Sequence, residues 1–220
     1  MSQGTSIAIE NIVETIRERV LKGEYAPGAK LSENKLAKEF SCSRTPVREA
    51  IKRLEQDNLV VVQPFSGSYV KQLTDEENLE LTEIRASLES LAFRLACDRR
   101  VDAGPLKQLV AQMGDILESE DPDFVRYGQA HYQFHMTLIE MSGNAMLIDM
   151  YKRMNLNTAS KLFYYKMSRP EAEITQQEHS AIVTALSLGD TEAGQQFMFN
   201  HLWKKRERLI HQLEKGAEAD

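Results

Sequence analysis

The stretch LSENKLAKEFSCSRTPVREAIKRLEQ, residues Leu31–Gln56, decides the fold of the first part of the chain, because it predicts two short helices joined by a tight turn. Ser32 can cap the first helix and Ser43 the second. Pro46 falls in the first turn of the second helix, where a proline is tolerated. Two helices separated by so few residues cannot pack comfortably as an antiparallel pair. The pattern is typical of a helix-turn-helix.

The residues on either side of this stretch complete a small domain. Upstream, apolar residues recur at intervals of three and four between residues 9 and 20, which predicts an amphipathic helix that ends near Gly23. Downstream, the β-rich runs LVVVQ and SGSYVKQ, residues 59–63 and 66–72, predict a hairpin with a turn that contains Pro and Gly. Three helices followed by a hairpin predict a winged helix-turn-helix domain over residues 1–74.

The remaining residues, 75–220, predict only helices. Thr74 and Glu77 have the spacing of a capping box at the start of the first one, so we expect the domain boundary there. Apolar residues then recur at helical spacing in six segments separated by turn or capping sequences. The segments are residues 75–100, 103–119, 122–141, 145–167, 171–188 and 191–214. The predicted fold is mainly α, a winged helix-turn-helix followed by an all-helical antiparallel bundle of about six helices.

Composition indicates a globular protein whose two parts differ in charge. Of the 220 residues, 42% are hydrophobic and 27% are charged, and the formal net charge is −6. Residues 1–73 carry 11 Lys and Arg against 9 Asp and Glu, whereas residues 74–220 carry 16 against 24. The two parts are therefore expected to have different partners.

The sequence gives no signal for a membrane segment or a disulfide framework. No run approaches about 18 consecutive apolar residues, and Glu10 and Glu14 interrupt the N-terminal segment before a signal-like apolar core could form. Cys42 and Cys97 lie far apart without a CxxC motif, which argues against both a disulfide framework and a cysteine zinc site. We expect a cytoplasmic protein without a membrane partner.

One face of the second helix in the helix-turn-helix is basic. Arg44, Arg48 and Lys52 follow one another at intervals of four, while apolar residues fill another face. The major groove of DNA accommodates one helix, and arginine can reach phosphates and guanine edges with paired hydrogen bonds. The alternative is a solvated surface helix whose cations pair with Glu49 and Glu55. The position of the helix after a tight turn, within a three-helix array, favours DNA binding.

Four of the five histidines lie at helical positions in the acidic part of the chain. His131 and His135 share one helix face, with Cβ atoms about 5–6 Å apart, which is a spacing typical of metal ligands. His179 and His201 lie in other predicted helices, and helical bundles build metal sites from such convergent side chains. For any single histidine, an ordinary core or surface role is the alternative. His211 is excluded because it lies about 80° around its helix from His201.

The segment KLSENKLAKEFSCSRTPVREAIKRLEQDNLV, residues Lys30–Val60, resembles the signature of the GntR family of bacterial transcription regulators. The match covers nearly all of the first domain, although Asn34 stands where the family usually has Arg. The resemblance implies that the partner is a pseudo-palindromic operator DNA, with the wing near its minor groove. The DNA contacts that it implies are Lys35, Ser43, Arg44, Thr45 and Arg48 in the helices and Ser66, Gly67 and Ser68 in the wing.

The second part resembles the FCD domain of the FadR-type branch of that family. HYQFH, HSAIVTALSLGD and HLW match the family's metal-ligand motifs, with His131 where the family usually has Asp. The resemblance implies a divalent transition metal, zinc or nickel, and a small organic acid in a cavity beside it. The implied metal ligands are His131, His135, His179 and His201.

Arg85 is the candidate arginine for the carboxylate of that acid, because an arginine supplies fixed positive charge to an anion that leaves water. An ordinary helix-surface ion pair with Glu89, four residues further on, is an alternative of equal weight. Asn157 and Tyr164 are candidates for the lining of the same cavity on the basis of helix position alone.

These features together predict a homodimeric, nucleoid-associated repressor whose operator affinity changes when a small carboxylate binds beside the metal. A dimer is expected because two half-sites provide affinity and register that one small domain lacks. A metal sensor is the alternative, and a metal-dependent hydrolase with a DNA-binding appendage is a weaker one. Tyr132 stands where an HExxH motif has its general-base Glu, although Glu178 remains a candidate base. The chain is therefore predicted not to be an enzyme.

Overall fold

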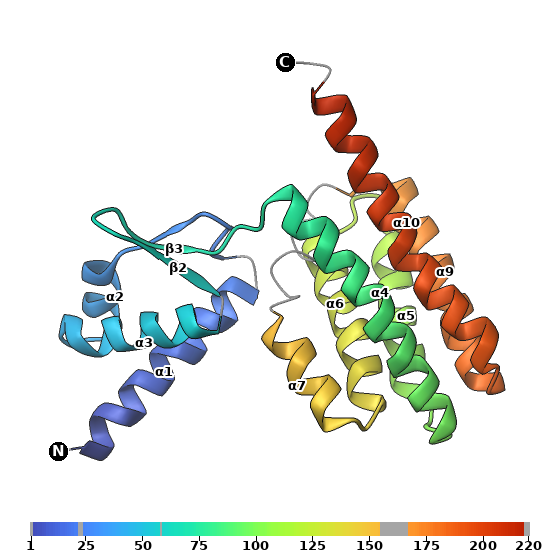
Figure 1. Ribbon diagram of the computed structural model, residues 1–220, viewed down its shortest axis with the longest axis horizontal. Coiled ribbons are helices and arrows are strands. Elements are labelled where there is room, and N and C mark those ends of the chain that lie inside the picture. The colour runs from blue at the N-terminus through green and yellow to red at the C-terminus, as the bar shows by residue number, and fades with distance from the viewer. Residues whose placement is uncertain (1, 22–23, 58, 155–166, 218–220) are drawn as a thin grey trace. The chain divides into compact units, whose positions relative to one another are not determined.

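A computed structural model describes residues 2–21, 24–57, 59–154 and 167–217. These residues fall chiefly into two compact units, and the second begins at Leu73 (Figure 1). Helices dominate both units, so the predicted mainly α class is confirmed. None of the helices in the described ranges is long and apolar enough to cross a membrane.

Three helices form the core of the first unit. They are α1 (Ser2–Leu21), α2 (Glu33–Glu39) and α3 (Arg44–Gln56). The apolar stripe of α1 is buried and packs against the apolar face of α3. Buried aliphatic residues of α1 and α3 include Ile12, Val13, Ile16, Val20, Val47, Ala50, Ile51 and Leu54. Because this face of α3 is buried, the face that carries Arg44 and Arg48 is left exposed.

A small antiparallel sheet completes the first unit. β1 (Lys30–Leu31) pairs with β3 (Gly67–Val70), which in turn pairs with β2 (Val60–Gln63). β2 and β3 are the predicted hairpin and form the wing (Figure 1). β1 was not predicted, because a strand of two residues is too short to show an alternation of apolar and polar positions. At the tip of the wing, Phe65 is fully exposed and has a φ of 62°.

The two helices of the helix-turn-helix begin with different capping chemistry. The Ser32 hydroxyl accepts a hydrogen bond from the backbone N–H of Lys35 at 3.4 Å, as the sequence predicts. Ser43 occupies the N-cap position of α3, but its side chain makes no capping hydrogen bond, so that prediction is wrong. The third residue of α3 would normally donate this bond, but it is Pro46, which has no N–H.

The second unit contains six helices within the described residues and no strand among them. The helices are α4 (Asp75–Asp98), α5 (Gly104–Glu118), α6 (Phe124–Met141), α7 (Ala145–Arg153), α9 (Arg169–Leu188) and α10 (Thr191–Ala217). α10 packs against α4 and α9, and α6 packs against α4 and α5. The segment predicted as one helix over residues 145–167 is helical to Arg153, and residues 155–166 lie outside the described part of the chain.

Capping residues fix where the helices of this unit begin and end. Thr74 and Glu77 form the predicted capping box at the start of α4, in which each side chain bonds the backbone N–H of the other. Ser168 and Glu171 form a second box at the start of α9. The same helix ends at Gly189, whose φ of 69° suits a residue without a side chain.

Gly194 permits the close packing of α10 on α4. A Cβ atom at this position would lie 1.9 Å from Cζ of Phe93, whose ring is fully buried. We expect Gly194→Ala to lower the free energy of unfolding by about 1–3 kcal/mol, because a buried ring cannot move aside without disturbing its neighbours. Denaturant unfolding measures the loss. Gly114→Ala is the control and should lose little, since the nearest atom there is the side-chain amide of Gln176 at 3.2 Å. Equal stability of the two variants would contradict the prediction.

Candidate functional site

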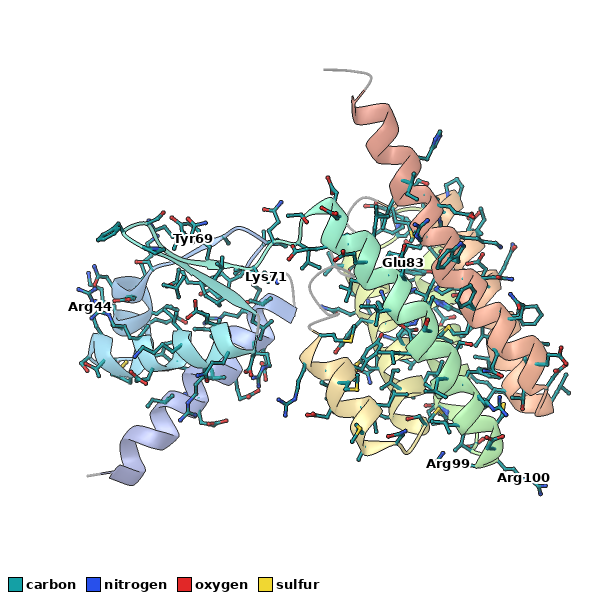
Figure 2. All side chains as sticks on the ribbon, viewed as in Figure 1. Arg44, Tyr69, Lys71, Glu83, Arg99 and Arg100 are labelled. Atoms are coloured by element: carbon teal, nitrogen blue, oxygen red, sulfur yellow. The ribbon has the colours of Figure 1, made fainter. Side chains whose placement is uncertain are left out.

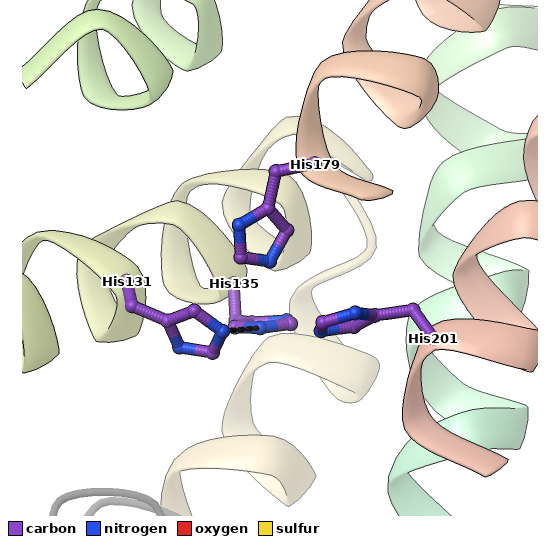
Figure 3. A group of neighbouring side chains, drawn as sticks. All are labelled: His131, His135, His179 and His201. Atoms are coloured by element: carbon purple, nitrogen blue, oxygen red, sulfur yellow. Dashed lines mark hydrogen bonds between the residues drawn. The ribbon is translucent and has the colours of Figure 1, made fainter. Parts of the chain in front are cut away.

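Four histidines converge inside the second unit (Figure 3). α6 supplies His131 and His135, α9 supplies His179 and α10 supplies His201. All four side chains are buried, and one ligand atom from each lies within 4.8 Å of the others. The structure thus brings together all four histidines that the sequence singled out.

The periodicity of α6 and the packing of α9 and α10 explain this convergence. His131 and His135 lie one helical turn apart, and their Nε2 atoms are separated by 3.2 Å. The ring centroid of His179 lies 4.6 Å from that of His131 and 4.7 Å from that of His201. Rings from three helices therefore direct nitrogen atoms toward one small volume.

Glu89, on α4, fixes the tautomer of His135. Its Oε2 accepts a hydrogen bond from Nδ1 of His135, which leaves Nε2 of that ring to face the other histidines. Its Oε1 accepts hydrogen bonds from Nε of Arg85 at 2.9 Å and from the hydroxyl of Tyr151 at 2.7 Å. Burial opposes ionisation, but His135 and Arg85 outweigh it and hold the pKa of Glu89 below its ordinary value. Glu89 is therefore a buried carboxylate with every oxygen in use.

Glu178, on α9, holds His201 in the same way. Its Oε2 accepts a hydrogen bond from Nδ1 of His201 at 2.8 Å, and its Oε1 accepts one from Nζ of Lys204 at 2.9 Å. Burial raises the pKa of Glu178, but the contacts with His201 and Lys204 lower it by more. The pKa of Glu178 therefore lies below its ordinary value. The two carboxylates place negative charge just outside the four imidazole rings.

The donor set fits a divalent metal ion. Both ring nitrogens of His179 are buried and have no hydrogen-bond partner among the described residues, and such atoms are rare unless something else satisfies them. Burial lowers the pKa of His131 and His179 well below the ordinary value and that of His135 to about 4. These rings are therefore in the neutral form that binds metals, and imidazole nitrogen suits zinc and nickel.

A second candidate site lies in the first unit, where α2, α3 and the wing line one groove. The side chains of Arg44 and Arg48 face it and are 55% and 57% exposed. Residues 62–68 of the wing form its other wall. Figure 2 shows Arg44 on α3 and Tyr69 on the wing. The groove therefore collects the two elements that the sequence predicted to contact DNA.

The other predicted DNA contacts differ in their exposure. Lys35, Ser43, Thr45 and Ser66 are exposed and Gly67 is half-buried. Ser68 is only 5% exposed, because it lies on the inward face of β3 together with Val70. Ser68 nevertheless belongs to the lining of the groove. Sequence reasoning missed Phe65, because the tip of a hairpin has no periodic pattern that marks a residue as exposed.

Two known family models match the chain, one over each of its two parts. Residues 8–70 match the model of the bacterial regulatory proteins of the gntR family, and residues 80–203 match the model of the FCD domain. The chain belongs to the GntR family. YdhC, an HTH-type transcriptional regulator of Bacillus subtilis strain 168, is 30% identical over 209 residues, which covers 92% of this chain and 91% of that protein.

Two further proteins are similar to this GntR-family chain. The gluconate operon transcriptional repressor of Bacillus licheniformis is 35% identical over 117 residues, which is 53% of this chain and 44% of that protein. The crystal structure of a GntR transcriptional regulator from Rhodococcus sp. RHA1 has the same fold, with a TM-score of 0.80, 22% identity and coverage of 92% and 97% of the two chains. This GntR-family chain is a transcriptional regulator and not an enzyme. Glu178, the candidate general base in the sequence, contacts Nδ1 of His201.

The candidate effector residues of this GntR-family regulator have different outcomes. Arg85 is 3% exposed and forms an ion pair with Glu89 at 2.9 Å, so the alternative pairing exists, but it is buried and not at the helix surface. Asn157 and Tyr164 lie outside the described residues. Lys205 was missed, although it follows His201 by one helical turn, and it is only 8% exposed.

Proposed function

We propose that this protein is a homodimeric, cytoplasmic repressor that binds a pseudo-palindromic operator through residues 1–74. A small organic acid, bound beside a metal ion in residues 75–220, changes the operator affinity. The buried four-histidine cluster, joined through Glu89 to Arg85, is the observation that carries the proposal. The similarity to a gluconate operon repressor supports both the repressor role and an acid as the signal.

The four histidines would hold a divalent ion, zinc or nickel by the preference of imidazole. Such an ion supplies fixed positive charge to a carboxylate oxygen. The replacement of the family's usual Asp by His131 removes one negative charge from the ligand set, because the carboxylates Glu89 and Glu178 contact only the outer Nδ1 atoms of His135 and His201. We therefore expect the metal centre to be more favourable to an anionic ligand than one with a directly bound carboxylate.

Two buried basic side chains add to the case for an acid. Arg85 is held by Glu89, and Lys205 lies close enough for both of these charges to act on its ammonium group. Burial lowers the pKa of Lys205 well below its ordinary value, and Arg85 lowers it further while Glu89 raises it. A carboxylate that arrived beside this lysine would favour the charged form and be stabilised by it. Recognition of an acid therefore uses residues from both α4 and α10.

A metal sensor is the second candidate, and one observation favours it. Four histidines are enough to close a tetrahedral shell around zinc, which would leave no position for an acid. In either case a ligand shifts operator affinity only if it binds the DNA-competent and incompetent arrangements with different affinity. In the sensor the metal ion binds the two arrangements with different affinity, whereas in the first candidate the organic acid does so.

Operator binding measured with metal alone and with acids at constant metal separates the two candidates. We expect gluconate, lactate or succinate at constant metal to change the operator dissociation constant by about 5- to 150-fold, while the matching amides change nothing. A response to metal with no response to any acid would support the sensor. If neither metal nor acid changes operator binding, both regulatory proposals are wrong. Elemental analysis and mass spectrometry of material released from purified protein identify the natural ligands.

A further inference from the structure

Glu33 lies at the centre of the groove in the first unit. It is the first residue of α2, directly after the N-cap Ser32, where the partial positive charge of a helix N-terminus favours a carboxylate. Its side chain is only 25% exposed and contacts two arginines of α3. Burial raises its pKa, but hydrogen bonds from Arg44 and Arg48 outweigh this and hold the pKa below its ordinary value. Glu33 is thus an ionised acid within a basic surface.

The contacts use different edges of the two guanidinium groups. Arg44 donates from Nε at 3.2 Å and from Nη2 at 2.7 Å to the same oxygen of Glu33. Arg48 donates only from Nε, at 3.1 Å and 2.9 Å to the two oxygens. Nη1 and Nη2 of Arg48 make no hydrogen bond to any residue that the structure describes. The contact with Glu33 therefore leaves the terminal pair of donors on Arg48 available for another acceptor.

This orientation suits the recognition of guanine. The O6 and N7 atoms of guanine in the major groove accept a pair of hydrogen bonds from an arginine. A long, exposed arginine side chain normally loses rotamer freedom when it makes such a contact. A carboxylate that already holds the Nε edge reduces this loss and leaves the terminal donors in a fixed plane.

The same carboxylate disfavours contact with phosphates. Glu33 faces the groove that also contains Arg44 and Arg48, so it reduces the net positive charge that DNA of any sequence would meet. Binding without sequence preference depends mainly on that charge. One residue can therefore raise specific binding and lower non-specific binding together.

We propose that Glu33 is a positioning residue that sets sequence discrimination, by holding Arg48 for guanine and by repelling the phosphate backbone. The inference rests on the proposed binding of DNA by the first unit. The alternative is an ordinary surface ion pair that only ties α2 to α3. Exposed pairs of that kind contribute little to stability and would not affect the choice of DNA sequence.

Glu33→Gln tests the proposal, with Glu49→Gln as the matched control. Glu49 also pairs with a cation of α3, Lys52 at 3.1 Å, and its change removes the same charge without touching Arg48. The probes are a duplex selected by the wild-type protein from a random library, a scrambled duplex, and the selected duplex with 7-deazaguanine. We expect Glu33→Gln to reduce the ratio of selected to scrambled affinity roughly tenfold and to lose sensitivity to 7-deazaguanine. Glu49→Gln should change both affinities by the same factor.

The same substitution in an Arg48→Lys variant separates an effect through Arg48 from an indirect effect on folding. In Arg48→Lys there is no Nε edge for Glu33 to hold, so adding Glu33→Gln should no longer change the ratio. A Glu33→Gln ratio equal to that of the wild type would overturn the proposal. So would an equal effect of Glu33→Gln with and without Arg48. If the wild-type protein itself shows no sequence preference, the proposed DNA-binding function is wrong, which is a separate outcome.

Discussion

Replacing His179 by alanine should abolish tight binding of a divalent metal. The ring lies within the four-histidine cluster, and its nitrogens have no hydrogen bond to the described part of the chain. The substitution therefore removes a ligand and leaves no buried partner unsatisfied. Loss of an outer contact to a ligand weakens metal binding by about 10- to 100-fold, so loss of the ligand itself should exceed that range. Competition with a chromophoric chelator measures the change.

Unfolding supplies an independent readout of the same site. Metal at 100 times its dissociation constant should raise the free energy of unfolding of the wild-type protein by about 2.7 kcal/mol, and the same concentration should leave His179→Ala nearly unchanged. His211→Ala is the matched control, because His211 is an exposed histidine on α10 outside the cluster. Metal binding that survives in His179→Ala and weakens in His211→Ala would place the site elsewhere.

The fold was largely predictable because its signals are local. The apolar stripe of α1, the capping box of Thr74 and Glu77, and the tight turn before α3 each depend on residues within a few positions of one another. β1 was not predictable in this way, since its two residues are ordered by pairing with β3, far along the chain. The Ser43 cap failed because one nearby residue, Pro46, removed the donor that the capping rule assumes.

The site was predictable only in its inner part. Histidine is rare and its spacing is informative, so His131, His135, His179 and His201 could be selected before their positions were known. Glu89 and Lys205 could not be distinguished in the sequence from the many charged residues of helix surfaces. Their burial follows from the packing of α10 on α4, which no local pattern contains. The role of Glu33 was hidden for the same reason, because it depends on which edge of Arg48 the carboxylate meets.

Replacing Arg48 by alanine should weaken binding to a selected operator by about 1–3 kcal/mol, which corresponds to roughly 5- to 150-fold. The expected loss comes from the two terminal donors that the contact with Glu33 leaves available for a base edge. Glu33 keeps Arg44 as a partner in this variant, so no unpaired carboxylate is created. Fluorescence anisotropy at one fixed salt concentration measures the change, because binding to DNA varies steeply with salt.

Lys52→Ala distinguishes base recognition from phosphate contact. Lys52 follows Arg48 by one turn on the same face of α3, and its side chain is 65% exposed. If it contacts phosphate, its loss should weaken selected and scrambled duplexes equally and lower the slope of the salt dependence by about 1. Arg48→Ala should instead weaken the selected duplex much more than the scrambled one. If Arg48→Ala shows the uniform loss expected of Lys52→Ala, Arg48 contacts the backbone, and the start of α3 does not read bases in the major groove.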